Sequence, residues 1–309
     1  MTTQHPLAGV YAAAVTPVKD DLSLDLDSVP ELMKFLAARG CHGMILFGTT
    51  GEGPSFAPSE RETLMRAVSD CRDAVPGFRI LAGTGTPSLQ ETIELTRLAF
   101  DLGLDGTLVL PPYYFRQATD DGLFNWFSEL IRKAVPTNAH ILGYHFPRVA
   151  GIGFSLDLLS RLKDTFPTQF AGIKDSSHDA DLARSLGERF GSDLAVFTGT
   201  DVYLPLAMQN YAAGCITAPA NIISADLREI WNAMNEGTDS SEAQARVQKK
   251  REILDKYPPF PPTLKALMHR IHKFPRWKVK PPLLNLAPDS EEKLVHEFEG
   301  IIEEQKAPR

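Results

Sequence analysis

One lysine, Lys174, stands at the end of a short apolar segment that has the composition of a buried strand. Phe170, Ala171 and Ile173 precede it, so the chain carries its amine into apolar surroundings. A buried lysine is costly unless it is paired or takes part in chemistry. A desolvated amine holds its proton less tightly, and the free amine can attack a carbonyl carbon. The segment therefore indicates a Schiff-base nucleophile at Lys174, with a solvated lysine at a frayed strand end as the alternative.

The residues after Lys174 are placed by strand geometry. Successive side chains of a strand point to opposite faces, so Ser176 shares the face of Lys174 and Asp175 points away. We therefore expect Ser176 to lie beside the amine, and we expect no ion pair between Lys174 and Asp175.

A loop of small residues, 48–52 (Gly-Thr-Thr-Gly-Glu), follows another apolar segment. Gly48 and Gly51 allow a tight backbone, while Thr49 and Thr50 supply hydroxyl groups. Hydroxyls and exposed backbone N–H groups together can hold a carboxylate, as the N-termini of helices do. The loop indicates a small-anion site, with an ordinary loop of glycine and threonine as the alternative.

Two tyrosines also follow apolar segments, Tyr144 directly and Tyr114 after a Pro-Pro-Tyr sequence. Tyrosine hydroxyls can transfer protons, although aromatic side chains at strand ends more often pack. The residues around these segment ends contain no cluster of His, Cys and carboxylate side chains at metal-ligand spacing. The tyrosines are therefore candidates for proton transfer, with packing as the alternative, and we predict no metal site.

A second glycine-containing loop, residues 83–86, raises the alternative of nucleotide binding by an oxidoreductase. The third glycine of a dinucleotide-binding fingerprint is absent, because Ser88 stands at its position. This departure counts against a nucleotide site.

The elements that must position these residues alternate regularly along the chain. Short apolar segments, typical of strands buried on both faces, each precede a helical segment at intervals of about 30 residues. Eight strands are expected, at residues 9–16, 43–47, 78–82, 107–110, 140–144, 170–174, 194–198 and 215–218. The pattern predicts an α/β fold, a closed (β/α)8 TIM barrel, whose active site lies where the strands end. An open doubly wound sheet is the alternative.

Local signals place some of the helices. Ser59 with Glu62 has the spacing of a capping box for a helix that ends near residue 75, and a helix is expected at 203–213. After about residue 235 the alternation stops, and helices at 240–256, 264–271 and 291–303 are separated by proline-rich joints. We therefore divide the chain into a barrel domain, 1–235, and a C-terminal helical extension, 236–309, with fraying after residue 305.

Composition sets the class of protein. The chain has 309 residues, 43% of them hydrophobic and 23% charged, with a formal net charge of -7. These values predict a globular protein that binds neither nucleic acid nor a membrane. Three scattered cysteines and a start, residues 1–6, without a secretory pattern predict a cytoplasmic location.

Four motifs in register resemble the dihydrodipicolinate synthase / N-acetylneuraminate lyase family over roughly residues 7–290. They are the loop 48–52, Pro-Tyr-Tyr at 112–114, Tyr-His-Phe-Pro at 144–147 and Gly-Ile-Lys at 172–174. The resemblance implies a pyruvate-dependent class I aldolase or lyase: a (β/α)8 barrel with C-terminal helices that assembles as a homodimer or homotetramer. No cofactor is implied, because the substrate is held as a covalent imine.

The resemblance also implies a catalytic role for four residues. Lys174 forms the imine with pyruvate or another 2-oxo acid, and Tyr144 is the acid and base beside it. Thr49 links Tyr144 to Tyr114 of a neighbouring subunit.

The resemblance further implies that the loop 48–52 binds the substrate carboxylate. Thr50 binds it together with the backbone N–H groups at Gly48 and Gly51, while Glu52 holds the loop in shape.

Several residues depart from the family pattern. His145 replaces the usual asparagine of the tyrosine motif. The synthases of lysine biosynthesis carry an arginine two residues after the motif's proline, where this chain has Val149, with Arg148 one residue earlier. We expect Arg148 to bind substrate, and the shift counts against the lysine-pathway role.

The Gly-x-Asp-Glu stretch of sialic acid lyases is also altered. Residues 199–202 keep Asp201 and lose the glutamate, which counts against a sialic acid substrate. Asp201 and Ser176 are instead expected to hold hydroxyls of a shorter sugar acid.

These inferences predict a lyase that cleaves or forms a carbon–carbon bond between pyruvate and an aldehyde, with a 2-keto-3-deoxy sugar acid as the preferred substrate. A 2-keto-3-deoxy acid dehydratase of the same family and a dihydrodipicolinate synthase are the alternatives. A non-catalytic 2-oxo-acid-binding protein is the alternative from a different class.

Overall fold

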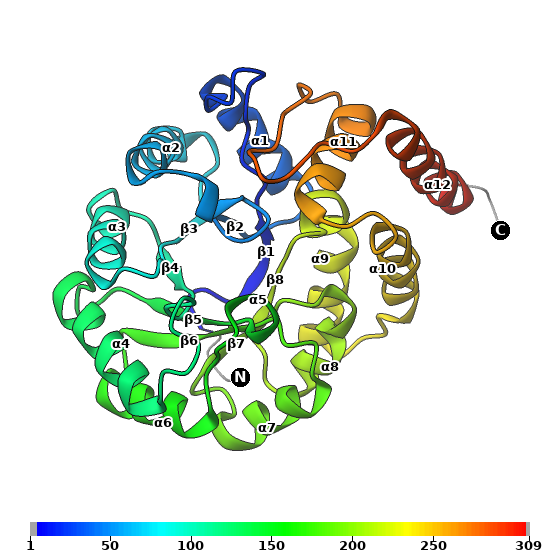
Figure 1. The fold of residues 1–309 in the computed structure, drawn as a ribbon. Helices are drawn as coiled ribbons and strands as arrows, with labels where there is room; N and C mark the ends of the chain where they lie inside the picture. Colours follow the sequence, from blue (N-terminus) through cyan, green and yellow to red (C-terminus); the bar gives the residue numbers. More distant parts are fainter. Residues whose placement is uncertain (1–4, 307–309) are drawn as a thin grey trace.

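Eight parallel strands pair in the order of the sequence, and the last pairs with the first to close a barrel (Figure 1). The structure is a computed structural model that describes residues 5–306. The strands are β1 Gly9–Ala13, β2 Gly43–Leu46, β3 Arg79–Gly83, β4 Gly106–Val109, β5 Ile141–His145, β6 Phe170–Asp175, β7 Ala195–Thr198 and β8 Gly214–Thr217. All eight predicted strands are present with shifted ends, and the predicted TIM barrel is confirmed.

Closure depends on a close approach of two backbones. In the β1–β8 ladder Gly214 is paired with Gly9. A Cβ atom on Gly214 would lie 1.9 Å from the carbonyl oxygen of Gly9, so no larger residue fits without moving a strand. Glycine at 214 therefore lets the eighth strand reach the first.

Helices surround the barrel (Figure 1). They are α1 Val29–Ala38, α2 Pro58–Asp70, α3 Leu89–Asp101, α4 Asp120–Ala134, α6 Leu156–Thr165, α7 Ala180–Phe190, α8 Leu204–Gln209 and α9 Ala220–Glu236, with a single turn, α5 Pro147–Ala150, after β5. A buried cluster of alternate strand residues, among them Tyr11 and Phe197 in edge contact at 5.8 Å, fills the barrel.

Several predicted helix boundaries are wrong for local reasons. Helix α2 is capped at Ala57 instead of the expected Ser59, and it ends at Asp70, before the expected residue 75. The Glu60 carboxylate accepts a hydrogen bond from the Ala57 N–H at 2.9 Å in place of the expected Ser59–Glu62 pair. A proline suits the first helical position, because its missing N–H is unused there. Helix α8 stops at Gln209, before the expected residue 213, because the chain turns with a positive φ of 66° at Tyr211.

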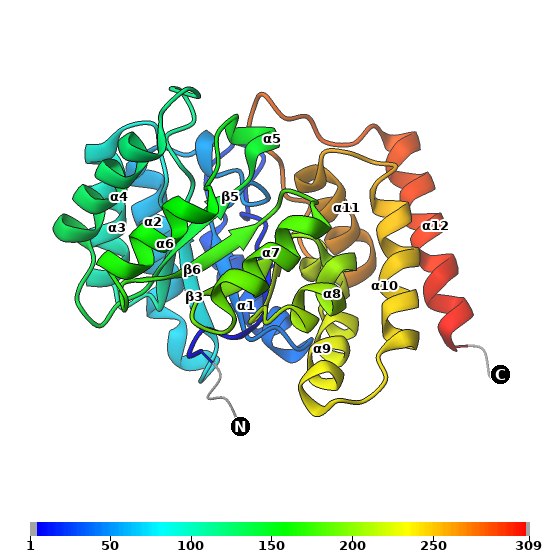
Figure 2. The same ribbon diagram turned by 90° about the horizontal axis from the view of Figure 1, so that it is seen from below.

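The extension forms three helices, α10 Ser241–Leu254, α11 Phe260–His272 and α12 Pro288–Lys306. Figure 2 shows them together on one side of the barrel, beyond α9. Helix α11 begins four residues before its expected start, since Pro261 and Pro262 occupy its first turn, where prolines are tolerated. The expected fraying after residue 305 and the segment 1–6 fall partly outside the described residues.

The extension shares its core with the barrel. One buried cluster contains Met33 of α1 and Leu227 of α9 together with Leu254, Leu267 and Phe298 of the extension. The division at residue 235 stays a prediction. No helix within residues 5–306 is long and apolar enough to cross a membrane.

A buried ion pair fixes the loop after β2 to the extension. Lys265 Nζ of α11 lies 2.5 Å from Glu52 Oε1, and the two side chains are 2% and 0% exposed. Glu52 Oε2 accepts a second hydrogen bond, from the Lys280 N–H at 2.7 Å. Burial lowers the pKa of Lys265, and the Glu52 charge opposes that shift. Glu52 therefore ties the loop 48–52 to two segments of the extension.

We expect Lys265→Met to lower the free energy of unfolding by about 3–5 kcal/mol, because it leaves the buried Glu52 carboxylate without its countercharge. Urea unfolding measures the loss. The double variant Glu52→Gln/Lys265→Met removes both charges and is expected to lose less. Lys133→Met, which breaks an exposed pair with Glu129, serves as the control and is expected to lose about 0–1 kcal/mol. Equal losses for Lys265→Met and Lys133→Met would contradict the role given to the buried pair.

Candidate active site

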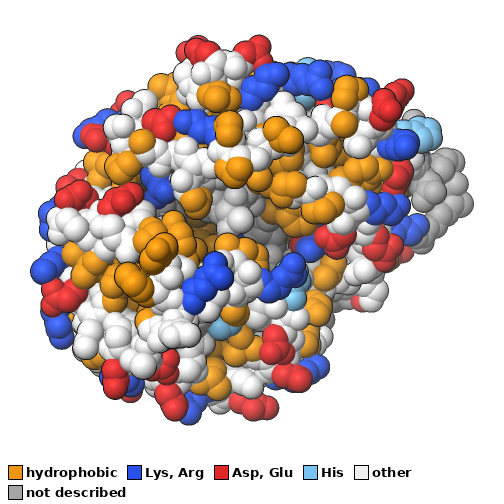
Figure 3. All heavy atoms as spheres, viewed as in Figure 1, with side chains coloured by type: hydrophobic (Ala, Val, Ile, Leu, Met, Phe, Trp, Pro, Cys, Tyr) orange, Lys and Arg blue, Asp and Glu red, His pale blue; other side chains and the backbone are white. Residues whose placement is uncertain are grey.

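The carboxyl ends of all eight strands meet on the face toward the viewer in Figure 1. Figure 3 shows a hollow at the centre of this face, with Lys and Arg side chains gathered along one edge. A cavity of about 300 Å³ lies at the strand ends. Its lining comprises Thr49, Thr50, Tyr144, Phe146, Arg148, Lys174, Ser176, His178, Gly199, Ala218, Pro219, Arg251, Pro258, Pro259, Phe260 and Pro261. The cavity thus brings together six of the ten predicted site residues.

Lys174 and Tyr144 are neighbours across the β5–β6 ladder. They are paired in register, and Lys174 Nζ lies 4.2 Å from the centroid of the Tyr144 ring. Both are buried, at 4% and 5% exposure, and Tyr144 stacks on Phe146 with ring centroids 5.6 Å apart. The pairing brings a buried amine within reach of a phenol at the same cavity.

Ser176 lies with Lys174 at the cavity, as strand alternation predicts, and Asp175 turns away. The Asp175 carboxylate accepts a hydrogen bond from the Ser177 N–H at 2.9 Å, and no ion pair joins it to Lys174 in the described chain. A Cβ atom on Gly199 would lie 1.9 Å from Ser176 Oγ. Glycine at 199 therefore leaves the room that Ser176 needs.

The loop after β2 presents unused donors. Thr50 is buried and Thr49 is exposed, and both line the cavity. The Thr16 hydroxyl donates to the Gly51 carbonyl at 2.7 Å, which holds the turn. Among residues 5–306, no hydrogen bond uses the backbone N–H groups of Thr49, Thr50 or Gly51. Such a set of free N–H groups can receive a carboxylate.

A second cavity of about 290 Å³ shares Thr49 and Tyr144 with the first. It also includes Gly48, and most of its other side chains are apolar. Within the described residues no hydrogen bond joins Thr49 to Tyr144. Tyr114 is 76% exposed and lines neither cavity, so the described chain does not itself bring Tyr114 to Tyr144.

The one-residue shift of the arginine has a clear structural outcome. Both residues lie on the short helix α5, where Arg148 lines the Lys174 cavity and Val149 lines the second cavity. Arg148 is exposed, and within residues 5–306 it makes no hydrogen bond or ion pair. It is therefore a cation available to a ligand.

Asp201 lies behind the cavity wall instead of in it. It is 0% exposed, and its Oδ1 lies 2.5 Å from Nη1 of Arg251, which does line the cavity. Burial raises the pKa of Asp201, and the Arg251 charge opposes that shift. Its position favours an effect through Arg251 over the expected direct bond to a substrate hydroxyl.

Sequence reasoning missed Arg251, His178 and Phe260. The predicted site residues all lie at or after strand ends, whereas Arg251 and Phe260 belong to the extension, at α10 and the start of α11. No local motif marks either residue. His178 does follow β6, four residues after Lys174, and its place in the sequence was the available signal.

His145 has a structural environment. Its Nδ1 accepts a hydrogen bond from the Phe154 N–H at 3.0 Å, and burial lowers its pKa while the nearby Asp175 charge opposes the shift. A neutral ring with a free acceptor nitrogen satisfies this bond. His145, which replaces the family's usual asparagine, therefore fixes the backbone at Phe154, after α5.

The threonine hydroxyls of the loop 83–86 form hydrogen bonds within the protein. Thr84 Oγ1 lies 2.8 Å from Thr96 Oγ1, and the Thr86 hydroxyl donates to the Ser88 carbonyl at 2.9 Å. These threonines support α3 rather than facing a ligand.

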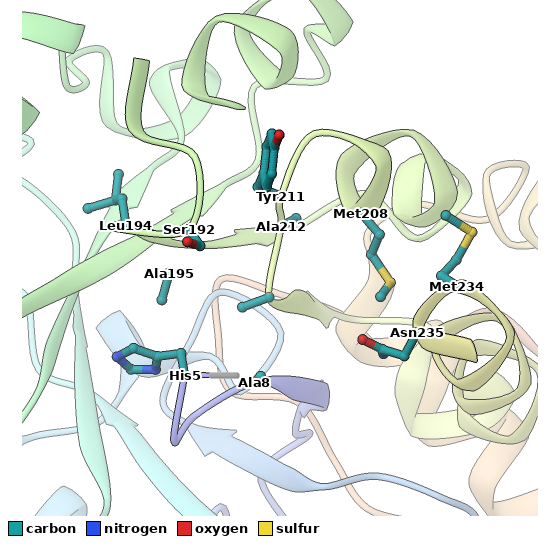
Figure 4. Close-up of a pocket in the computed structure, with 11 residues that line it drawn as sticks. His5, Ala8, Ser192, Leu194, Ala195, Met208, Tyr211, Ala212, Met234 and Asn235 are labelled. Carbon is teal, nitrogen blue, oxygen red and sulfur yellow. The ribbon is translucent and has the colours of Figure 1, made fainter. Parts of the chain in front are cut away.

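A third cavity, of about 200 Å³, lies at the opposite end of the barrel (Figure 4). It is lined by the starts of β7 and β8 and by side chains such as His5, Met208 and Tyr211. It contains neither lysine nor arginine, and it is remote from Lys174. In the part of the chain that is described, no group of three His, Cys, Asp or Glu side chains is arranged to hold a metal ion.

Comparison with known proteins identifies the family. Residues 6–301 match the family model described as the Dihydrodipicolinate synthetase family. The chain belongs to this family. The predicted resemblance is confirmed, and so is the predicted enzyme class, a Schiff-base aldolase or lyase acting on 2-oxo acids.

Individual relatives of this dihydrodipicolinate synthetase family member span nearly the whole chain or most of it. It is 34% identical over 295 residues to an uncharacterised DapA-like lyase of Chloroflexus aurantiacus, covering 95% of this chain and 97% of that protein. It is 33% identical over 231 residues to a 4-hydroxy-tetrahydrodipicolinate synthase of Methanothrix thermoacetophila, covering 74% and 75%. The fold matches YagE, a prophage protein of E. coli K12, with a TM-score of 0.89 at 22% identity, over 96% of this chain and 99% of that one.

Proposed function

We propose that this family member cleaves or forms a carbon–carbon bond between pyruvate and an aldehyde, with a 2-keto-3-deoxy sugar acid as substrate. The observation that carries the proposal is the buried Lys174 amine, 4.2 Å from the Tyr144 ring in a cavity whose wall includes the loop 48–52. YagE, which has the same fold, was crystallised in complex with pyruvate. The covalent imine makes an added cofactor unnecessary.

The proposed cleavage begins at Lys174. Its free amine attacks C2 of the 2-oxo acid. The C2 oxygen takes one proton from the amine and one from solvent and leaves as water, giving a protonated imine. Thr50 and the unused N–H groups of the loop bind the C1 carboxylate, with Gly48 and Gly51 giving the loop its tight turn on either side of the two threonines. Ser176 contacts the chain beyond the carboxylate.

Tyr144 then takes the proton of the C4 hydroxyl, while its own phenol proton passes to Thr49 along the proposed link to Tyr114. The bond between C3 and C4 breaks, its electron pair moves to the imine to form an enamine, and the aldehyde leaves. The enamine takes a proton at C3, and water releases pyruvate from Lys174. Arg148 and Asp201 act on the far part of the substrate.

The same proposal includes assembly and location. The exposed Tyr114 is proposed to reach Thr49 of a neighbouring subunit in a homodimer or homotetramer, where the apolar cavity beside Thr49 and Tyr144 is open to receive it. A cytoplasmic location is supported by three free cysteines, and recovery of the protein in a secreted or membrane fraction would contradict it.

A synthase is the second candidate, favoured by the name of the Methanothrix relative. It would join pyruvate to an aldehyde rather than cleave a sugar acid.

Incubation with pyruvate followed by borohydride reduction is expected to add the mass of the reduced imine to the peptide that contains Lys174. Lys174→Ala is expected to lose both the adduct and turnover, because the lining of the cavity contains no second lysine. Peptide mass spectrometry locates the adduct. Absence of the adduct from Lys174 would contradict the proposed mechanism. An adduct without turnover of any 2-oxo acid would indicate a binding protein.

Tyr144→Phe is expected to retain the adduct and lose about 10²–10⁴-fold in kcat, because positioned proton transfer contributes that much. The assay offers a panel of 2-keto-3-deoxy acids, and pyruvate with amino aldehydes, and identifies the products. Release of pyruvate supports the aldolase, whereas loss of water with the carbon chain intact identifies a dehydratase. Normal turnover by Tyr144→Phe would remove Tyr144 from proton transfer.

Tyr114→Phe is expected to lower kcat by at least about tenfold while the oligomer seen by sedimentation is unchanged, because it removes only the proposed proton link. Tyr211→Phe, at the opposite end of the barrel and 64% exposed, is the matched control and should keep full activity. A fully active monomer would rule out a shared site.

A further inference from the structure

Arg251 reaches the Lys174 cavity from outside the barrel domain. It lies on α10, and three contacts fix its guanidinium. Nη1 lies 2.5 Å from Asp201 Oδ1, Nε lies 2.8 Å from Asp255 Oδ1, and Cζ lies 5.2 Å from the centroid of the Phe260 ring. A side chain held by two carboxylates and an aromatic face is pre-organised, so binding a ligand costs it little further entropy.

The fixed guanidinium still has donors to offer. A guanidinium carries five N–H groups, and Asp201 and Asp255 engage Nη1 and Nε. No described residue accepts a hydrogen bond from Nη2 of Arg251. The Arg251 side chain is 12% exposed, and Arg251 lines the cavity.

Arg148 adds a second guanidinium to the same wall, and the cavity lining contains no Asp or Glu. Both arginines act on His178, which also lines the cavity. Burial lowers the pKa of His178, and the charges of Arg251 and Arg148 lower it further. At neutral pH the imidazole is therefore uncharged. Arg251 is paired with Asp201 and Asp255, so the uncompensated positive charge at the cavity is that of Arg148, while Arg251 contributes the free N–H groups of its Nη2.

We infer that Arg148 and Arg251 together bind a second anionic group at the far end of the substrate, a carboxylate or a phosphate ester. Planar guanidinium groups match both anions, with two parallel hydrogen bonds each. The inference rests on the proposed Schiff-base function, and it narrows the substrate to a 2-oxo acid with two anionic ends.

Asp201 has the part of a positioning residue. It is 0% exposed, and its Oδ2 finds no hydrogen-bond partner among the described residues, so Arg251 is its main source of stabilisation. Breaking such a pair leaves a buried charge uncompensated, which disfavours other orientations of Arg251. Asp201 thus acts on the substrate through the direction it imposes on Arg251.

The test measures binding without requiring the natural aldehyde. Three probes are compared by the concentration that gives half-maximal borohydride trapping on Lys174: 2-oxoadipate, 2-oxohexanoate and a 2-oxo acid of the same length with a terminal phosphate ester. Pyruvate is the reference. The wild-type protein is expected to trap at least one dianionic probe at an about 10- to 100-fold lower concentration than 2-oxohexanoate. The better of the two dianions distinguishes a carboxylate from a phosphate ester.

The variants are Arg148→Gln, Arg251→Lys and Asp201→Asn. Arg148 is exposed and unpaired in the described chain, so Arg148→Gln should fold normally. Arg251→Lys keeps a positive charge opposite Asp201 and loses the planar fork. Each variant is expected to reduce the preference for the dianion by about 5-fold or more, measured relative to pyruvate trapping by the same variant.

Arg246→Gln is the matched control. Arg246 lies on the same helix and pairs with Asp226 and Glu229 away from the cavity, and Lys250 remains on Asp226 when it is replaced. It should keep the full preference for the dianion.

Two outcomes overturn the inference. Equal trapping of the dianionic and monoanionic probes by the wild-type protein is one, and an unchanged preference in both Arg148→Gln and Arg251→Lys is the other. In either case trapping of pyruvate on Lys174 would leave the Schiff-base function standing. Failure to trap pyruvate itself would instead refute that function, so the two failures are distinguishable.

Discussion

The pairing of β8 with β1 is the constraint on which the site depends. A closed parallel barrel has no free edge, and it brings the carboxyl ends of strands that are far apart in sequence to one face. Gly214 permits the closure because only a hydrogen at its α-carbon fits against the backbone of Gly9. With the barrel closed, Lys174 and Tyr144 become direct neighbours across β5 and β6, and the loop 48–52 lines the same cavity.

The C-terminal extension is tied to this face by two buried ion pairs. Glu52 with Lys265 holds the loop that presents the unused N–H groups, and Asp201 with Arg251 holds a cation at the cavity wall. Burying two charges costs free energy that their attraction repays only in good geometry, so such pairs are weak evidence for stability. Their places, one under a proposed carboxylate loop and one behind a cavity, fit a role in orientation.

The short helix α5 shows how a one-residue change in a motif alters a site. A helix advances about 100° per residue, so neighbouring side chains leave it in different directions. Arg148 lines the Lys174 cavity, whereas Val149, at the position where the lysine-pathway synthases carry arginine, lines the second cavity. The chain therefore presents a cation to the Lys174 cavity from a different position, in a lining that also includes Arg251.

The sequence by itself determined the strands, the barrel and the candidate lysine, because apolar runs, their spacing and strand alternation are local properties of the chain. It misjudged helix ends near Ser59 and Leu264, where prolines join the first turn instead of breaking the helix. Only the tertiary structure decided the far wall of the cavity. Arg251 is 77 residues from Lys174 in sequence, and no local pattern links them. Its direction is set by the buried carboxylate of Asp201, in the short 3-10 helix after β7, a contact that exists only once the extension has packed on the closed barrel.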